Sequence, residues 1–338
     1  MKVPEAVRAH HGVVGLDAFS QAGISPARVR AAVRAGTIER VARGLFVVPE
    51  RRDEWTSIVA SLVTWPTAVL TGRSALRLHG CDGFDEAPDC ADLRTLRKGS
   101  RAPYPAARRV DSDDIETIDG MRVLRPVPLV GRTVATIGAD LAEAAIETFL
   151  RRCQLTEAEL REACSGRRLT AGERSSLRAV MDRRGWGIPP TESYLETLTV
   201  QRVLRPAGLA HQRQVAIALG GAYLKRFDFQ LESGLLINCH GMAFHTSAAA
   251  VQQDAAYGLR LRLAGLEVET VTWGDVTRRP AKTARDLATR SAQVTAAQVA
   301  TQVPTHVAAG APSMRPVSPG LPLKKVPRVT KKVARNGP

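Results

Sequence analysis

The amino-acid sequence predicts a multidomain protein that mixes α+β and α/β regions, and three observations support this. Helix start and stop signals followed by two short strands predict a winged helix-turn-helix over 1–52. After an α/β middle region (53–185), the order helix, three strands, helix, strand, helix predicts an α/β sandwich over 186–295. The last 35 residues hold seven prolines, seven Lys/Arg and no acid, so we expect 296–338 to be a disordered basic tail.

The first two helices of the winged helix are predicted from amphipathic spacing and capping residues. Residues 4–11 have the pattern of an amphipathic helix. Asp17 is a good N-cap for a short helix over 18–21, which should stop at Gly23. We therefore expect two short helices before a third, longer helix.

The third predicted helix has the strongest start signal of the N-terminal region. Ser25 provides an N-cap and Pro26 occupies the first helical position, while Gly36 suits the C-terminal end. One face of this helix has the apolar spacing of a buried surface and consists of Val29, Ala32 and Val33. Three basic side chains lie away from that face: Arg28, Arg30 and Arg34.

Two short strands, 38–41 and 45–48, follow and predict the wing. Arg40 and Arg43 lie near its tip. A helix that carries arginines suits the major groove, and wing arginines suit phosphates, so this arrangement predicts binding to double-stranded DNA. The alternative is a winged helix that docks on another protein, with its arginines only solvated.

The middle region contains local signals but no catalytic constellation. Residues 55–79 read as helical with a break at 64–66, and 139–164 read as two helices, the second with a capping box formed by Thr156 and Glu159. The acidic cluster at 111–114 could bind a cation, although we expect a solvated loop. Short strands are predicted at 92–96, 115–118 and 122–124.

The C-terminal region is predicted to begin after the Gly/Pro-rich stretch at 185–190. Helices are expected over 191–204, 247–264 and 280–293, and strands over 213–219, 223–231, 234–240 and 267–272. This order is typical of the restriction-endonuclease type of α/β sandwich.

Composition narrows the range of partners. The chain has 48 Lys/Arg against 33 Asp/Glu, a net charge of +15, so a polyanion such as nucleic acid is the expected partner, unless an arginine-rich composition alone explains the charge. No apolar run reaches membrane-spanning length, and no secretory leader is visible, so we expect a cytoplasmic protein with no membrane partner. The five cysteines form no Cys-x-x-Cys pair, which disfavours a zinc ribbon.

Two series of short motifs carry a resemblance to known families. The N-terminal series is Gly15-Leu16, Gly23-Ile24-Ser25, Val29-Arg30, Gly36-Thr37-Ile38, Arg43-Gly44-Leu45-Phe46-Val47 and Ala68-Val69-Leu70-Thr71-Gly72-Arg73-Ser74-Ala75. It resembles AbiEi-type antitoxins. The C-terminal series is Glu192-Ser193, Leu195-Glu196, Phe227-Asp228-Phe229, Gly241, Phe244-His245, Asp254, Leu263-Ala264-Gly265 and Val271-Thr272-Trp273. It resembles very-short-patch-repair (Vsr-like) endonucleases of the PD-(D/E)XK group, and together the two series cover most of 10–295.

The second resemblance implies a metal-dependent DNA-cutting site. Asp228 would be the central metal ligand, Glu196 a helix carboxylate near the site, and His245 a histidine that assists catalysis. The family's second strand ends in Glu-x-Asp-Gly, whereas this chain has Asn238 and His240 in place of the two acids. An arginine of the family is also replaced, by Tyr257.

Loss of both acids predicts a weakened magnesium site, since Mg²⁺ prefers carboxylate and other oxygen ligands. A site built on Asp228 and His240 would suit a softer metal such as Mn²⁺ better. We therefore expect no certain cofactor, with Mg²⁺ or Mn²⁺ required if the nuclease site is active.

The leading interpretation is a DNA-binding regulator of the AbiEi antitoxin type with an inactive nuclease-like domain, whose expected partners are double-stranded DNA and a cognate toxin. Two alternatives remain open: a metal-dependent endonuclease with an altered site, and a module that docks on a toxin or phage protein without binding DNA. The tail would hold the DNA backbone through Lys324, Lys325, Lys331 and Lys332, or serve only solubility.

Overall fold

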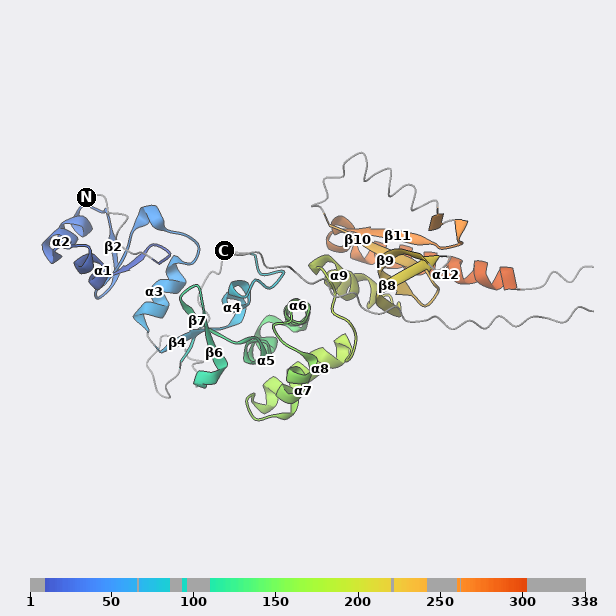
Figure 1. Ribbon diagram of the computed structural model, residues 1–338, viewed down its shortest axis with the longest axis horizontal. Coiled ribbons are helices and arrows are strands. Elements are labelled where there is room, and N and C mark those ends of the chain that lie inside the picture. Colours follow the sequence, from blue (N-terminus) through green and yellow to red (C-terminus); the bar gives the residue numbers. More distant parts are fainter. Residues whose placement is uncertain are drawn as a thin grey trace, which may run out of the picture. The chain divides into compact units, whose positions relative to one another are not determined.

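The structure is a computed structural model that describes residues 10–65, 67–85, 93–95, 110–219, 222–241, 260–261 and 263–302 (Figure 1). The chain divides into two compact units, 1–297 and 298–338. Except for the last turn of the final helix, every element below belongs to the first unit. The described part is a mixture of helices and three small sheets, which confirms the expected mixed α and β class.

The N-terminal region is a three-stranded antiparallel sheet of order β1-β3-β2 with two helices. Helices α1 (Leu16–Gln21) and α2 (Pro26–Arg34) lie between the first and second strands in sequence. Two helices followed by a β-hairpin are consistent with the predicted winged helix, although the expected helix over 4–11 lies mostly outside the described residues. The strands are β1 (Val13–Gly15), β2 (Glu39–Ala42) and β3 (Leu45–Val47).

The predicted N-cap at Asp17 is wrong, because α1 begins earlier. Gly15 is the N-cap, and it is still paired with Leu45 in the sheet. The Leu16 amide donates to the Gly44 carbonyl at 2.9 Å, so the chain passes directly from strand to helix. Asp17 lies in the first turn instead, where its charge favours the helix dipole.

The middle region has a four-stranded sheet of order β5-β4-β7-β6, in which only β4 and β7 are parallel. Three of its strands confirm the predicted ones, while β4 and two helices, α5 and α8, were not predicted. The strands are β4 (Ala68–Leu70), β5 (Leu93–Thr95), β6 (Ile115–Ile118) and β7 (Met121–Leu124). The helices are α3 (Thr56–Thr64), α4 (Gly72–Leu78), α5 (Pro126–Ile137), α6 (Ala139–Arg151), α7 (Glu157–Ser165) and α8 (Ala171–Arg184), with single 3-10 turns at Pro49–Arg51 and Ser112–Asp114.

Two local predictions in this region have opposite outcomes. The capping box of α7 is confirmed: the Thr156 amide donates to Glu159 at 2.7 Å, and the Glu159 amide donates to the Thr156 hydroxyl at 3.2 Å. The expected solvated acidic loop is wrong for Asp114, which is 2% exposed and faces Arg132 and Arg168 at 3.5 and 3.8 Å. Burial raises the pKa of Asp114.

The C-terminal region contains a four-stranded sheet of order β11-β10-β9-β8, with one parallel pair, β10 and β11. Most of the expected helix over 247–264 lies outside the described residues, and the last helix continues to Gln302, past the expected start of the tail. The strands are β8 (His211–Leu219), β9 (Ala222–Leu231), β10 (Leu236–His240) and β11 (Val268–Thr272). The helices are α9 (Tyr194–Thr199), continued by a π-helical turn (Val200–Leu204), α11 (Trp273–Thr277) and α12 (Pro280–Gln302).

Strand β3 is buried on both faces and separates two hydrophobic cores. Phe46 packs with the helices of the winged helix, whereas Leu45 and Val47 belong to the large core of the middle region. The sheet of the winged helix therefore shares a core with α3 and β4. The core of the C-terminal sheet is separate and includes Leu195, Leu198, Phe229, Ile237 and Val271.

Helix α6 carries a charged network that connects the middle region to the C-terminal sheet. Glu143 and Glu147, one helical turn apart, are only 1% and 0% exposed. Each accepts hydrogen bonds from one arginine of α8 and from one arginine that follows α9 in the chain. The two pairs of arginines are Arg183 with Arg205, at 2.7 and 2.6 Å from Glu143, and Arg184 with Arg213, at 3.1 and 2.6 Å from Glu147.

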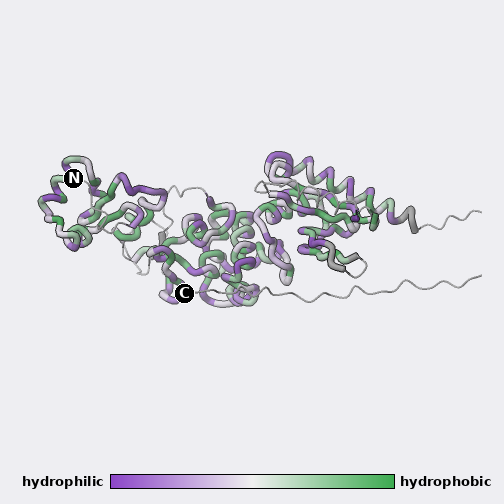
Figure 2. The backbone as a smooth tube through the Cα atoms, turned by 45° about the horizontal axis from the view of Figure 1, so that its top comes forward, coloured by the Kyte–Doolittle hydropathy of each residue, from purple (hydrophilic) through white to green (hydrophobic). Residues whose placement is uncertain are grey.

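Hydrophobic and hydrophilic residues alternate along the helices, and none of those drawn in colour in Figure 2 is hydrophobic over a long stretch. Within the described residues, no helix combines the length and the apolar character needed to cross a membrane.

Candidate nucleic-acid interface and nuclease-like site

Helix α2 is fixed by its cap and by one apolar face, as predicted. The Ser25 hydroxyl accepts the Arg28 amide at 3.4 Å, and Pro26 is the first helical residue. Val29 and Ala32 are buried against Phe19 and Phe46 in the small core. This packing determines which side of α2 faces solvent.

The solvent side of α2 has the composition of a groove-reading surface. Arg30 and Arg34 are one turn apart and exposed, and Ala27 and Ala31 beside them are exposed and small. Within the described residues, neither arginine forms an ion pair. A free guanidinium can bond guanine bidentately, and small neighbours allow the helix backbone to approach a groove closely. Arg28 is also exposed, on the flank of the helix.

The wing adds two exposed arginines to the same region. Arg43 is at the turn between β2 and β3, where Gly44 has φ 73°, and Arg40 donates to the Ala42 carbonyl at 3.4 Å. Glu39 is engaged in an ion pair with Arg52. Residues 16–48 contain five arginines against Asp17 and Glu39, so this region has a positive balance that suits phosphates.

In the second candidate site, Asp228 lies where strands β9 and β10 separate. The ladder between these strands ends at the Ile237–Phe229 pair. Beyond it, the Cys239 amide donates to the Asp228 carboxylate at 2.6 Å and so takes the place of a ladder bond. Burial raises the pKa of Asp228, the Cys239 amide lowers it, and Glu192 raises it further; the net shift is upward.

Glu196 is brought near Asp228, but both its oxygens are occupied. One oxygen accepts the Ser193 hydroxyl at 2.8 Å, and the other accepts the Glu192 amide at 2.8 Å and the Gln214 side chain at 2.7 Å. Burial raises its pKa, and the charge of Asp228 adds to that effect. These bonds fix the start of α9, so Glu196 has a structural task independent of any catalysis.

The two residues in place of the lost acids lie on the same face of β10, two positions apart. Asn238 is half-buried and His240 is exposed. The charge of His240 acts on Asp228 and lowers its pKa, so the two are near each other. Within the described part of the chain, however, Asp228, Glu196 and His240 do not bring three ligand atoms within 4.8 Å of one another. His245 and the tail residues Lys324, Lys325, Lys331 and Lys332 lie outside the described residues.

One residue of this site was not predicted from the sequence. Gln214 on β8 has φ 55°, a conformation that residues with a side chain rarely adopt. Its amide nitrogen donates to Glu196, while its buried amide oxygen has no hydrogen-bond partner within the described residues. The sequence contained no signal for it beyond a polar residue inside an otherwise ordinary strand.

The comparisons with known proteins concern the N-terminal region. Residues 1–49 match the family model of the AbiEi antitoxin transcriptional regulators. This stretch contains α1, α2 and the wing. No curated protein matches the chain.

Proposed function

We propose that the protein is a cytoplasmic, DNA-binding transcriptional regulator of the AbiEi antitoxin type. The main support for DNA binding is that Arg30 and Arg34 are exposed one turn apart on α2, within the stretch that matches that family. In this proposal α2 enters the major groove of double-stranded DNA, Arg30 and Arg34 contact base edges, and Arg40 and Arg43 hold phosphates. A cognate toxin is the second partner that the family suggests.

We further propose that the region 186–295 is a Vsr-like nuclease domain that no longer cuts. Two observations support inactivity: Asn238 and His240 stand where acids are needed, and the oxygens of Glu196 are occupied by structural hydrogen bonds.

The raised pKa values of Asp228 and Glu196 favour the other candidate, an altered metal-dependent endonuclease, because clustered carboxylates with raised pKa values are common at catalytic sites.

The test of DNA recognition uses the full chain and a duplex that the wild type selects from a random-sequence pool. Arg30→Ala and Arg34→Ala should each weaken binding by about 1–3 kcal/mol if each guanidinium makes a bidentate base contact. Titration by gel shift or anisotropy measures the loss. Arg285→Ala, which removes an equally exposed arginine from α12, is the matched control and should bind like the wild type. Unchanged binding by Arg30→Ala/Arg34→Ala would rule out α2 as the recognition helix and favour a protein-docking role.

The tail is tested separately. Deleting 304–338 removes seven positive charges, including Lys324, Lys325, Lys331 and Lys332, and should weaken binding to random-sequence duplex. Each lost phosphate contact should reduce the slope of log affinity against log salt by about 0.9. An identical salt slope for the full and shortened chains would show that the tail does not contact DNA.

A further inference from the structure

Two adjacent histidines meet an aspartate that is distant in sequence. His10 and His11 lie one residue before β1, and Asp119 is in the turn between β6 and β7. One Asp119 oxygen is 2.8 Å from Nε2 of His11, and the other is 3.6 Å from Nε2 of His10. Each of the three residues offers one ligand atom, and these atoms lie within 4.8 Å of one another. Among the described residues, no other group of three or more His, Cys, Asp or Glu side chains is gathered this closely.

These distances are close to those of a tetrahedral metal site. Ligand atoms about 2.0–2.2 Å from a tetrahedral Zn²⁺ lie about 3.3–3.6 Å from one another. The three ligand atoms here lie within 4.8 Å of one another, so shifts on the order of 1 Å would allow all three to coordinate. Two imidazole nitrogens and a carboxylate are a donor set that Zn²⁺ accepts, with a water as the fourth ligand.

Asp53 supports a metal site because it contacts the other nitrogen of the His11 imidazole. Its carboxylate is 2.6 Å from Nδ1 of His11, so that nitrogen donates its proton to Asp53. Metal-binding histidines almost always donate their second ring N–H to a carboxylate, a carbonyl or water, and this bond directs the other nitrogen to the metal. Asp53 thus leaves Nε2 of His11 as the ligand atom, and a metal ion bound there would displace to solvent the proton that Nε2 now donates to Asp119. The Trp55 amide and the Thr56 hydroxyl hold Asp53 in turn, at 2.8 and 3.4 Å.

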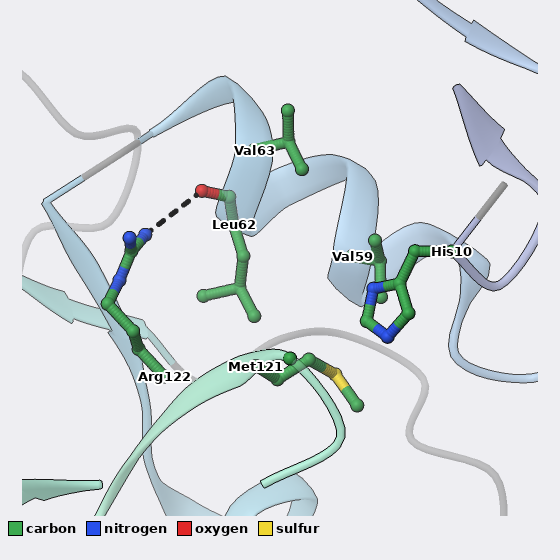
Figure 3. A pocket seen from close by; sticks show the side chains of 7 residues that line it. His10, Val59, Leu62, Val63, Met121 and Arg122 are labelled. Atoms are coloured by element: carbon green, nitrogen blue, oxygen red, sulfur yellow. Dashed lines mark hydrogen bonds between the residues drawn. The ribbon is translucent and has the colours of Figure 1, made fainter. Parts of the chain in front are cut away.

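His10 supplies the second independent observation. The side chain is 42% exposed, but its Nε2 atom is buried and, apart from the 3.6 Å ion-pair contact with Asp119, has no hydrogen-bond partner within the described residues. The ring packs against Gly120, where an added Cβ would lie 3.1 Å from the ring and where φ is 69°. Beside it is a cavity of about 170 Å³, and Figure 3 shows the imidazole between Val59 and Met121. A bound cation would satisfy this nitrogen.

We propose that Nε2 of His10, Nε2 of His11 and the carboxylate of Asp119 form a binding site for a divalent transition-metal ion, most suitably Zn²⁺, with Asp53 orienting His11. The site would connect the entry of the winged helix to the β6–β7 hairpin of the middle region. It does not depend on the proposed DNA binding or on the nuclease-like site.

The experiment uses the full-length, metal-stripped protein with Zn²⁺ and Co²⁺ as probes. We expect one Zn²⁺ per chain at this site by isothermal titration, and a visible Co²⁺ absorption typical of tetrahedral coordination. Asp119→Asn keeps the shape of the side chain and should weaken binding at least tenfold. Asp53→Asn, which changes only the orienting group, should weaken it about 10–100-fold.

Two further variants separate this site from other histidines. His10→Ala/His11→Ala should lose one equivalent of Zn²⁺ and the Co²⁺ absorption, whereas His240→Ala should retain both. Circular dichroism checks that each variant is folded. The proposal is overturned if the wild type binds no metal, or if Asp119→Asn and the double histidine variant bind like the wild type. Loss of the Zn²⁺ only in His240→Ala would also overturn it and place the metal at the nuclease-like site.

Discussion

Replacing Glu147 by glutamine should lower the free energy of unfolding by about 3–5 kcal/mol, because it leaves buried guanidinium groups without their carboxylate. Glu147 is fully buried, and its two oxygens accept hydrogen bonds from Arg184, Arg213 and the Thr191 amide. Arg184 keeps Glu157 at 3.1 Å, but Arg213 has no other carboxylate within the described residues. Urea or thermal unfolding of the full chain measures the loss.

A matched control and a double variant show whether charge is the cause. Glu162→Gln makes the same change at an exposed position of α7 and should alter stability by less than about 0.5 kcal/mol. The double variant Glu147→Gln/Arg213→Met should lose less free energy of unfolding than the two single variants lose together, because Arg213→Met removes the charge that Glu147→Gln leaves uncompensated. A loss under about 1 kcal/mol for Glu147→Gln, or strict additivity in the double variant, would contradict the buried-pair account.

The second large effect is expected in DNA cleavage. The wild type should not nick supercoiled plasmid with Mg²⁺ or Mn²⁺, whereas Asn238→Glu with His240→Asp should introduce nicking. The two positions are on one face of β10, and Asp228 is near His240, so the variant would gather up to three carboxylates for a metal. A bound metal contributes several kcal/mol of transition-state stabilisation, which corresponds to about a thousandfold in rate.

The control for this gain is a third substitution. Asp228→Asn keeps an acceptor for the Cys239 amide but removes the charge, so nicking by the triple variant should fall to background. Nicking by the wild type that disappears in Asp228→Asn would refute inactivity and favour the altered endonuclease. Nicking that survives Asp228→Asn would indicate a contaminant or a different site.

The sequence predicted those elements whose signals are local. The Ser25 cap, the Thr156–Glu159 capping box and the hairpin of the wing each depend on residues within a few positions of one another, and the structure confirms them. Strand β4 was not predicted, because its three residues are all buried and an unbroken apolar run lacks the alternation that identifies a strand. Helix α5 was not predicted either, and seven of its twelve residues are buried.

Interactions between distant segments could not be predicted. Glu147 and Arg213 are 66 positions apart, and His11 and Asp119 are 108 apart, so their meeting depends on tertiary packing. The sequence identified Asp228 and Glu196 as neighbours only through a family resemblance. It did not reveal that hydrogen bonds within the protein already occupy both oxygens of Glu196.

The two-sided burial of β3 limits how far the N-terminal module can be transplanted. The family match ends at residue 49, but Leu45 and Val47 pack in a core that continues into α3 and β4. A chimaera that joined 1–49 to a foreign protein would expose these side chains, and each would forfeit about 1.5–3 kcal/mol of burial. Exchanging DNA specificity between relatives should therefore be done by grafting the solvent face of α2, or by moving the winged helix together with the whole middle region that shares its core.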